Sequence, residues 1–335
     1  MAYYGEGHAD PKGPGDARPT AMQIIKDEGM GGKLAGKVVV ITGVSSGIGI
    51  ETARALGTAG ATLYLTARDL PKAKVALRDF FDPSRMELVQ MEQTSLTSVR
   101  AAAETILEKT RTINILIANA GVVVFQNLQL TDSGHELHLA TNHLSHFLFF
   151  QLLKPALLTA SSPDFQSRVV MVASSGHRRR SGLNPSDNYH FQNGDYEPNR
   201  AYSQSKLANI YMANEIERRY GSVGLHALSV HPGAVATAIG RHLPVEVIQK
   251  MAQNQGLLRN LKDIPQGAAT TVWAAVSKGL EGKGGLYLSD CSVAEEDDLD
   301  ESIYSGKYAS YAFNPDEEAR LWKDSLEMVG LPKDE

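Results

Sequence analysis

Tyr202 and Lys206 are the residues of this sequence whose types and spacing most directly suggest acid–base chemistry. They stand four apart in "AYSQSKLAN", so on a helix their side chains share one face. A free tyrosine has a pKa of ~10, whereas a nearby ammonium favours the phenolate and lowers that pKa. A lone Y-x-x-x-K pattern is also compatible with a surface tyrosine and lysine on an amphipathic helix, so the surrounding motifs must decide.

A glycine-rich turn follows the β-branched run that opens "VVVITGVSSGIGIETARAL", residues 38–56. Its glycines are Gly43, Gly47 and Gly49, and a helical pattern follows them. A strand that leads through glycines into a helix presents free N–H groups and the positive end of the helix dipole, where a pyrophosphate fits. The spacing is G-x-x-x-G-x-G and not the G-x-G-x-x-G fingerprint, so a tight connection without a ligand stays open.

Strand and helix patterns alternate from residue 37 onward. The expected strands are "KVVVITG", "TLYLTAR", "RMELVQ", "INILIANAG", "SRVVMVAS" and "LHALSVHPG". Helical patterns lie between them, starting near Pro71 and covering about 95–109, 133–158 and 201–220. This alternation predicts an α/β domain, roughly residues 34–290, with a parallel sheet and helices on both faces.

Two segments interrupt the alternation, and the two ends of the chain differ from the middle. Residues 176–200 are polar, and residues 237–267 mix helix and loop. The run "HRRR" at 177–180 reads either as an anion patch or as a solvated loop. Residues 1–33 begin rich in glycine, proline and charge, which predicts a flexible N-terminal arm. Residues 291–335 form an acidic C-terminal tail with an expected helix around "DEEARLWKDSLEMV".

The composition narrows the class of protein. The 335 residues are 42% hydrophobic and 21% charged, as in ordinary globular domains, and the formal charge of −5 does not suggest a nucleic-acid-binding surface. No apolar run approaches the roughly 18 residues of a membrane helix, and the start lacks a signal-peptide core. The single Cys291 cannot form an internal disulfide. We therefore expect a cytoplasmic protein. His143, His146 and His231 lack metal-ligand spacing, so no metal is expected.

Four motifs stand in the order found in the short-chain dehydrogenase/reductase family, which the sequence resembles over about residues 34–288. They are "TGVSSGIG", "NAG" at 119–121, "YSQSK" at 202–206 and "HPG" at 231–233. The strings "GKLAGKVVVITG", "TNHLSHF" and "AYSQSKLAN" are similar to its retinol dehydrogenase and WW-domain oxidoreductase branch. The resemblance implies a Rossmann-like, doubly wound sheet of about seven strands, a bound nicotinamide dinucleotide, and a homodimer or homotetramer.

The resemblance also implies catalytic roles. Tyr202 would pass the proton to or from the substrate oxygen, while Lys206 would lower the tyrosine pKa and hold the nicotinamide ribose. Ser174 would hydrogen-bond the substrate carbonyl; the family's usual serine pair is shifted here, because alanine replaces its first member, and the neighbouring Ser175 is the alternative. Asn142 would anchor a water in the proton relay, or else fill a helix kink as a buried polar residue.

Other matching positions are expected to contact the cofactor. Asn119 would brace the sheet, and Glu92 stands where many relatives carry an aspartate near the adenine. Pro232 and Gly233 would shape the loop over the nicotinamide, and Thr237 would bond its carboxamide or the pyrophosphate. The complete expected set is Gly43, Ser45, Ser46, Gly47, Ile48, Gly49, Arg68, Glu92, Asn119, Ala120, Gly121, Tyr202, Lys206, Pro232, Gly233 and Thr237.

The end of the second strand, "TARD", bears on the choice between NAD and NADP. NAD sites usually offer a carboxylate to the ribose 2′-hydroxyl about twenty residues after the glycines. By the resemblance that carboxylate aligns with Ala67, and Arg68 follows, which suits a 2′-phosphate. A small shift of register would bring Asp69 to the ribose instead. The sequence favours NADP(H).

These residues predict an NADP(H)-dependent oxidoreductase that interconverts an alcohol with a ketone or aldehyde, most simply as a carbonyl reductase. Its partner would be a small carbonyl or alcohol substrate, with no nucleic acid and no membrane span. The expected pocket walls lie after Ser175 and in residues 237–267, in loops that vary within the family. The sequence therefore does not identify the substrate, and retinoids, steroids and polyketide-like ketones all stay open. The alternative is an NADP(H)-binding sensor or scaffold without turnover, for which a proton relay has no use.

Overall fold

A parallel sheet forms the centre of the computed structural model, which describes residues 4–123, 127–179, 182–237, 245–298 and 305–333. Its strand order is β3-β2-β1-β4-β5-β6-β7-β8, and only the β7–β8 pair is antiparallel. The doubly wound α/β sheet of about seven strands is thus confirmed, with the two-residue β8 added at the edge. The strands are β1 (Val38–Thr42), β2 (Thr62–Ala67), β3 (Met86–Gln90), β4 (Ile115–Ala118), β5 (Ser167–Val172), β6 (Leu225–His231), β7 (Leu286–Ser289) and β8 (Ser292–Val293).

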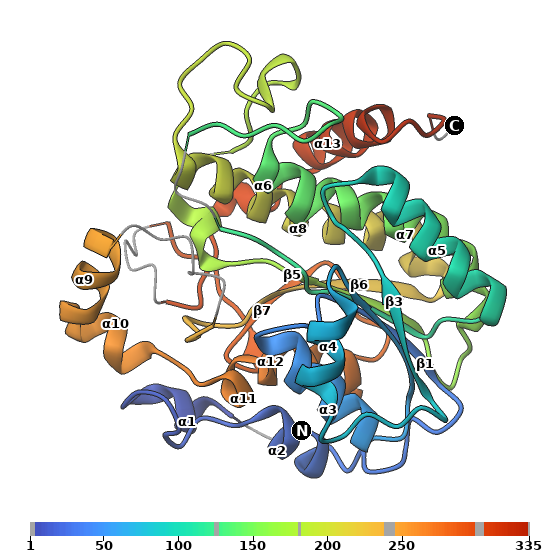
Figure 1. The fold of residues 1–335 in the computed structure, drawn as a ribbon. Helices are drawn as coiled ribbons and strands as arrows, with labels where there is room; N and C mark the ends of the chain where they lie inside the picture. Colours follow the sequence, from blue (N-terminus) through green and yellow to red (C-terminus); the bar gives the residue numbers. More distant parts are fainter. Residues whose placement is uncertain (1–3, 124–126, 180–181, 238–244, 299–304, 334–335) are drawn as a thin grey trace.

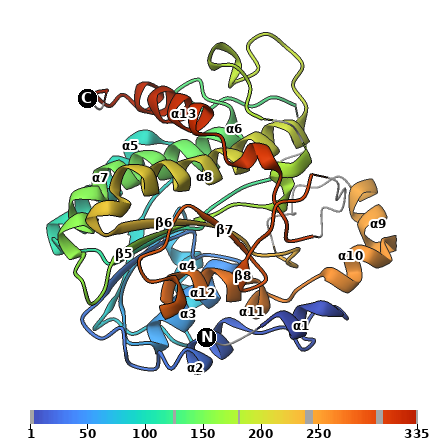
Figure 2. The same cartoon turned by 180° about the vertical axis from the view of Figure 1, so that it is seen from behind.

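Helices cover both faces of this sheet (Figures 1 and 2). One buried apolar layer includes residues of α5 (Leu96–Lys109), α7 (Ser145–Ala160), α8 (Pro198–Tyr220) and α13 (Pro315–Met328). The other includes residues of α2 (Ala21–Asp27), α3 (Ile48–Thr58), α4 (Leu70–Leu77) and α12 (Ala269–Val276). The strand order reverses between the parallel neighbours β1 and β4, and the carboxyl edge at such a switch point is where open α/β sheets bind ligands.

Local capping explains where several of these helices begin. The Ser95 hydroxyl accepts the Ser98 N–H at 3.2 Å, and α5 begins directly after it. An Asp69 carboxylate oxygen accepts the Lys72 N–H at 2.9 Å, which starts α4. Proline occupies the first turn of both α4 and α8, where its missing N–H costs no helical hydrogen bond.

The prediction of one long helix over residues 133–158 is wrong at the start of that range. A short α6 (Leu137–Leu139) leads into a π-helical turn (Ala140–Leu144), and α7 follows it. The buried Glu136 caps α6, because one carboxylate oxygen accepts the Leu139 N–H at 2.8 Å. π-helical turns are rare and often lie at functional sites.

The described part of the expected N-terminal arm, residues 4–33, packs on the domain, whereas the sequence analysis expected a flexible arm there. α1 (Gly5–Ala9) and α2 lie beside α10 (Gln255–Asn260), α11 (Ile264–Gly267) and α12 in both views (Figures 1 and 2). Ile24 and Leu34 are fully buried in the layer that contains α12. The Thr20 hydroxyl caps α2 by accepting the Gln23 N–H at 3.2 Å. This cap and the apolar spacing behind it were readable in the sequence.

The remaining elements lie in the interrupted segments and at the C-terminus. Residues 245–267 form α9 (Val245–Gln253), α10 (Gln255–Asn260) and α11 (Ile264–Gly267). Trp322 of α13 packs edge-on against Phe147 at 4.9 Å between ring centres. Cys291 is buried, and burial raises the pKa of its thiol to about 12, as expected for an inert thiol. Among the described residues, no helix has the length and apolar character needed to cross a membrane.

Candidate active site

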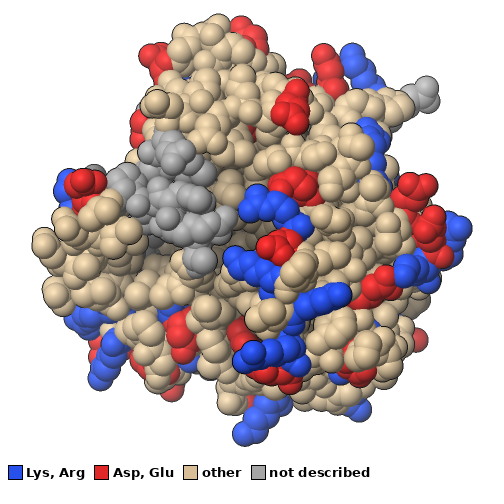
Figure 3. Space-filling view, in the orientation of Figure 1, with Lys and Arg blue, Asp and Glu red and all other residues tan. Residues whose placement is uncertain are grey.

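A cleft opens along the carboxyl edge of the sheet, and its walls are built from the residues that follow successive strands. Figure 3 shows a hollow on this face, with lysine and arginine side chains along one wall. Every residue expected to contact the cofactor lines the cleft, except Gly49. Of the four expected catalytic residues, Ser174, Tyr202 and Lys206 line it, whereas Asn142 does not. The cleft is lined by Gly43, Ser45, Ser46, Gly47, Ile48, Ala67, Arg68, Met91, Glu92, Gln93, Asn119, Ala120, Gly121, Val122, Thr141, Val172, Ala173, Ser174, Tyr202, Lys206, Pro232, Gly233, Val235 and Thr237.

The glycines of the first turn serve two different purposes. A Cβ on Gly43 would lie 2.8 Å from the Ala120 Cα, and one on Gly49 would lie 2.4 Å from the Gly43 carbonyl oxygen. Protein atoms therefore exclude side chains at these two positions. Gly47 instead takes φ 71° just before α3, and its nearest neighbour would be Thr237 at 3.5 Å. We conclude that only Gly47 keeps space open at the helix N-terminus, where an anion is favoured.

Asn119 joins the ends of β1 and β4. Its amide Nδ2 donates to the carbonyl oxygens of Thr42 at 2.8 Å and Gly43 at 3.2 Å. That amide would also lie 2.7 Å from a Cβ on Gly49. The expected bracing of the sheet therefore has a direct geometric basis, through two strand ends and the first turn of α3.

Tyr202 and Lys206 both lie on α8 and line the cleft. The Lys206 ammonium lies 5.9 Å from the centre of the Tyr202 ring. It donates to the Val172 carbonyl oxygen at 3.0 Å, the one hydrogen-bond partner it has among the described residues. A buried ammonium needs its donors satisfied, so two N–H groups are left for the oxygens of a ligand.

The pKa of Tyr202 differs from the sequence-based expectation. Burial raises it above the ordinary value of 10, while a hydrogen bond with Ser174 and the charge of Arg179 oppose the rise. The expected lowering by Lys206 is not seen, because desolvation of the hydroxyl dominates. Burial also lowers the pKa of Lys206 to about 8. At neutral pH the tyrosine is protonated and able to donate.

Ser174 and Tyr202 share a hydrogen bond, and Gly176 packs against both side chains. A Cβ on Gly176 would lie 3.0 Å from the Tyr202 Cε1 and 3.2 Å from the Ser174 Oγ, so a larger residue there would have to displace these side chains by a few tenths of an ångström. The Gly176 N–H donates to the Ser174 Oγ at 3.0 Å, which leaves the serine proton for another acceptor. Ser175 is buried, and its N–H donates to the His231 Nδ1 at 3.2 Å.

Replacing the two serines separately tests which one serves the substrate. We expect Ser174→Ala to lower kcat about tenfold, because one hydrogen bond to the reacting oxygen is worth about 1.4 kcal/mol. Ser175→Ala should change kcat by less than about threefold, since Ser175 lies outside the residues that line the cleft. Steady-state kinetics on both variants give the comparison. The opposite order of effects would assign the substrate contact to Ser175.

Asn142 lies in the π-helical turn with its side chain engaged by protein groups. Its Oδ1 accepts the Val122 N–H at 2.8 Å, and its Nδ2 donates to the Ser205 Oγ at 2.9 Å. A Cβ on Gly121 would lie 3.1 Å from that Oδ1 and 3.4 Å from the Lys206 Nζ. The absence of a Cβ at Gly121 thus lets the side chains of Asn142 and Lys206 approach the same point. These surroundings match the buried residue in a helix kink; a role as water anchor stays a prediction.

His146 is a residue of the site that the sequence analysis did not assign. Its Nδ1 donates to the Asn142 carbonyl oxygen at 2.9 Å, and its Nε2 accepts from the Thr42 hydroxyl at 2.8 Å. The Thr42 Oγ1 in turn accepts the N–H groups of Asn119 and Ala120, each at 2.9 Å. Burial lowers the pKa of His146 to about 4, so the imidazole is neutral. This series of hydrogen bonds connects the π-helical turn to the carboxyl ends of β1 and β4.

Glu136 and His138 form a buried hydrogen-bonded pair, and the His138 ring packs against the Tyr202 ring. The His138 Nδ1 lies 2.7 Å from a Glu136 carboxylate oxygen, and both side chains are fully buried. The His138 ring stands edge-on to the Tyr202 ring, with 6.1 Å between centres. The sequence analysis gave no reason to expect this contact.

Arg68 and Asp69 have different environments at the end of β2. The Arg68 side chain is 69% exposed, lines the cleft, and has its Nε 3.4 Å from a Glu92 carboxylate oxygen. Asp69 caps α4 and lies outside the cleft lining. The register in which Asp69 would serve the ribose therefore conflicts with its capping role. Glu92 contacts Arg68, which is a partner the sequence analysis did not expect.

Polar atoms without partners at the cleft fit a ligand rich in hydroxyl groups. Among the described residues, the Asn119 Oδ1 and the Thr141 Oγ1 are buried and have no hydrogen-bond partner. With the free donors of Lys206 and the open helix end at Gly47, they suit a ribose and a pyrophosphate. The described residues contain no group of three or more potential metal ligands. Of the expected pocket walls, residues 180–181 and 238–244 lie outside the described residues.

Comparisons with known proteins agree with this architecture. The short chain dehydrogenase family model matches residues 37–186. Short-chain dehydrogenase/reductase prx1 from Penicillium roqueforti is 44% identical over 328 residues, covering 98% of this chain and 95% of that protein. Oxidoreductase calI from Penicillium decumbens is 43% identical, covering 96% and 95%. Human retinol dehydrogenase 11 is 35% identical, covering 90% and 88%.

A solved structure of an uncharacterized protein from Mycobacterium paratuberculosis has a TM-score of 0.67 at 28% identity, covering 90% of this chain and 96% of its own. The Pseudomonas aeruginosa RhlG/NADP complex shares the fold, with a TM-score of 0.61 at 22% identity and coverage of 76% and 95%. The cleft, the motifs and these similarities lead to one conclusion: the chain belongs to the short-chain dehydrogenase/reductase family, in its retinol dehydrogenase-like branch.

Proposed function

We propose that this protein is an NADP(H)-dependent carbonyl reductase. The observation that carries the proposal is the convergence of Ser174, Tyr202 and Lys206 in one cleft that Arg68 also lines. Arg68 would hold the 2′-phosphate, Lys206 the nicotinamide ribose, and Gly47 would leave the pyrophosphate its place at the start of α3. A bound nicotinamide dinucleotide supplies or accepts the hydride.

Tyr202 carries the proton in this proposal. Its raised pKa keeps the hydroxyl protonated at neutral pH, so it can donate to a carbonyl oxygen that becomes an alcohol. Ser174 polarises that oxygen by donating its own proton in a hydrogen bond. The buried ammonium of Lys206 stabilises the phenolate that the transfer leaves behind. Carbonyl reduction is therefore the direction that we propose.

The substrate that we propose is a lipophilic or secondary-metabolite-like ketone or aldehyde. Similarity to a protein named retinol dehydrogenase 11 supports including retinal in a panel with steroid and polyketide-like ketones. The panel is assayed with NADPH and with NADH, and products are identified by mass spectrometry. A sensor or scaffold would bind NADPH and reduce no member of the panel. A cytoplasmic location and a homodimer or homotetramer complete the proposal.

The pH dependence of cofactor use tests the role of Lys206. A lysine pKa lowered to about 8 means that the ammonium is present below that pH and is lost above it. We expect kcat/KM to fall about fivefold between pH 8 and pH 9, as a single titration gives. Lys206→Arg keeps its charge at these pH values, so whatever activity it retains should not fall there. An unchanged high-pH fall in Lys206→Arg would assign the titration to another group.

A further inference from the structure

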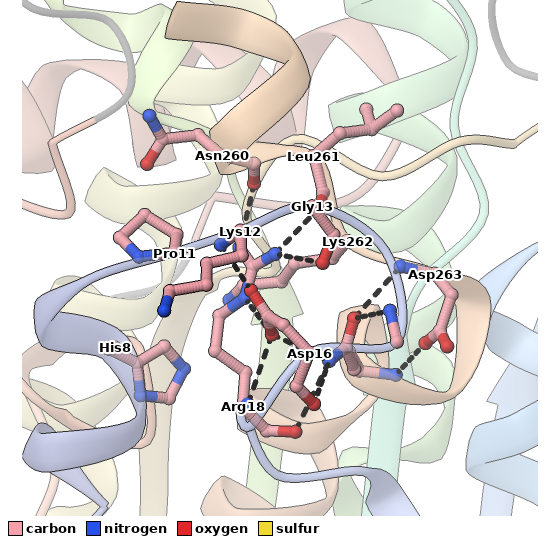
Figure 4. A network of polar contacts seen from close by, with 12 residues as sticks. His8, Pro11, Lys12, Gly13, Asp16, Arg18, Asn260, Leu261, Lys262 and Asp263 are labelled. Carbon is pink, nitrogen blue, oxygen red and sulfur yellow. Dashed lines mark hydrogen bonds and ion pairs between the residues drawn. The ribbon is translucent and has the colours of Figure 1, made fainter.

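Arg18, in the segment that precedes the family match, has a buried guanidinium that spans two distant parts of the chain. Its side chain is 3% exposed. The Nη1 donates to the Asn260 carbonyl oxygen at 2.8 Å, and the Nη2 to that of Leu261 at 2.7 Å. The Nη2 also donates to the Gly13 carbonyl oxygen at 3.0 Å, and the Nε to an Asp16 carboxylate oxygen at 2.8 Å. Figure 4 shows this network. One side chain thus satisfies the carbonyl groups at the end of α10.

Gln266 makes a second set of bonds between the same two segments. Its Oε1 accepts the Gly15 N–H at 3.0 Å, and its Nε2 donates to the Asp16 carboxylate at 3.0 Å. Asp263 caps α11 by accepting the Gln266 N–H at 2.8 Å, which holds the glutamine in place. We call residues 4–20 the N-terminal clasp, because they are hydrogen-bonded to residues 260–266 on the outside of the sheet.

Residues 260–263 are paired in turn with the loop that follows β6. The Lys262 N–H donates to the Ala234 carbonyl oxygen at 2.7 Å, and the Ala236 N–H donates to the Lys262 carbonyl oxygen at 3.2 Å. A Cβ on Gly233 would lie 2.8 Å from the Lys262 Cε, so the lysine stem packs directly under the loop. Several residues of this loop line the cleft: Pro232, Gly233, Val235 and Thr237.

An ion pair between the buried Lys262 and the partly exposed Asp290 links this segment to the end of β7. The Lys262 Nζ lies 2.8 Å from an Asp290 carboxylate oxygen, and the His8 Nε2 of the clasp lies 3.5 Å from the same oxygen. Lys262 is therefore held by its main chain to the loop and by its side chain to the end of β7. The clasp touches both Asp290 and the segment that carries Lys262.

We propose that the N-terminal clasp positions the 232–237 loop for cofactor binding, with Arg18 as the positioning residue. The inference rests on the cofactor cleft of the proposed function. Arg18 is not among the described residues that line that cleft, so its effect must pass through residues 260–263. A loop held in its binding conformation spares the cofactor the cost of ordering it. If the competent loop falls to about one tenth of the population, the apparent Kd rises about tenfold while kcat is unchanged.

The test compares Arg18→Ala with Arg85→Ala in the full-length protein. Arg85 is the matched control, because its Nη1 also donates to two carbonyl oxygens, those of Gly57 at 2.7 Å and Ala61 at 3.1 Å, away from the loop. We measure Kd for NADPH by fluorescence quenching, kcat at saturating NADPH, and amide hydrogen exchange of residues 232–237 and 260–263. Arg18→Ala should raise Kd about tenfold, speed exchange in both segments, and leave kcat within about twofold. Arg85→Ala should alter thermal stability only.

A second variant keeps the test decisive if Arg18→Ala fails to fold. Arg18→Lys keeps the charge and loses the fork that reaches several carbonyl groups, so its Kd should fall between those of the wild type and the alanine variant. A lower melting temperature with unchanged Kd and unchanged exchange would overturn the proposal. Wild-type protein that binds no nicotinamide nucleotide would overturn the proposed function instead. Exchange of residues 232–237 would then still decide whether the clasp orders the loop.

Discussion

Tyr202→Phe is expected to lower kcat by about two to four orders of magnitude while NADPH still binds, because a positioned acid–base group is worth about that much. Phenylalanine keeps the ring that packs edge-on against His138 and removes only the hydroxyl beside Ser174. The loss should therefore appear in kcat, not in the melting temperature. Stopped-flow measurement of NADPH oxidation with saturating ketone separates the chemical step from product release.

Tyr220→Phe is the matched control for this variant. Tyr220 ends the same helix, α8, and its hydroxyl accepts a hydrogen bond from the Lys154 Nζ at 3.0 Å outside the cleft. Its kcat should stay within about twofold of the wild type, as for a substitution far from the reacting groups. If Tyr202→Phe turned over as fast as Tyr220→Phe, the proton would have to come from another group.

Arg68→Ala is expected to weaken NADPH binding by about ten- to a hundredfold and to leave NADH binding almost unchanged. The two cofactors share the pyrophosphate, so the glycine turn cannot distinguish them. A charged hydrogen bond to the 2′-phosphate is worth about 1.5–3 kcal/mol, and ~1.4 kcal/mol is tenfold. Adding Ala67→Asp should shift the preference toward NADH, because it supplies a carboxylate to the ribose. Fluorescence titration with both cofactors gives the four dissociation constants.

Two further variants sharpen this result. Glu92→Gln removes the carboxylate that lies 3.4 Å from the Arg68 Nε, so NADPH binding should be equal or tighter. Arg78→Ala removes another exposed arginine, which pairs with Asp79 at 3.2 Å outside the cleft lining, and should leave both affinities unchanged. A wild type that binds NADH more tightly than NADPH would refute the NADP(H) assignment. Asp69 would then be the first residue to test, although one of its oxygens caps α4.

Several features of the fold were readable from the sequence because they depend on neighbours along the chain. Continuous β-branched runs predicted the buried parallel strands, and the caps at Asp69 and Ser95 mark where α4 and α5 begin. The N-terminal arm was predicted to be flexible from its glycine, proline and charge, whereas residues 4–33 pack on the domain. That prediction relied on composition and gave too little weight to two local signals, the cap at Thr20 and the apolar spacing at Ile24. These two signals account for the start of α2 and for its buried face.

The sequence by itself determined which residues could do chemistry, since the four-residue spacing puts Tyr202 and Lys206 on one face of any helix. The tertiary structure decided what surrounds them. Burial reversed the expected pKa shift of Tyr202, and the contact between Arg18 and Leu261 joins positions more than 240 residues apart. Helical spacing follows from backbone geometry, which each segment carries within itself. Desolvation and long-range pairing depend on which segments the folded sheet brings together, and no local pattern encodes them.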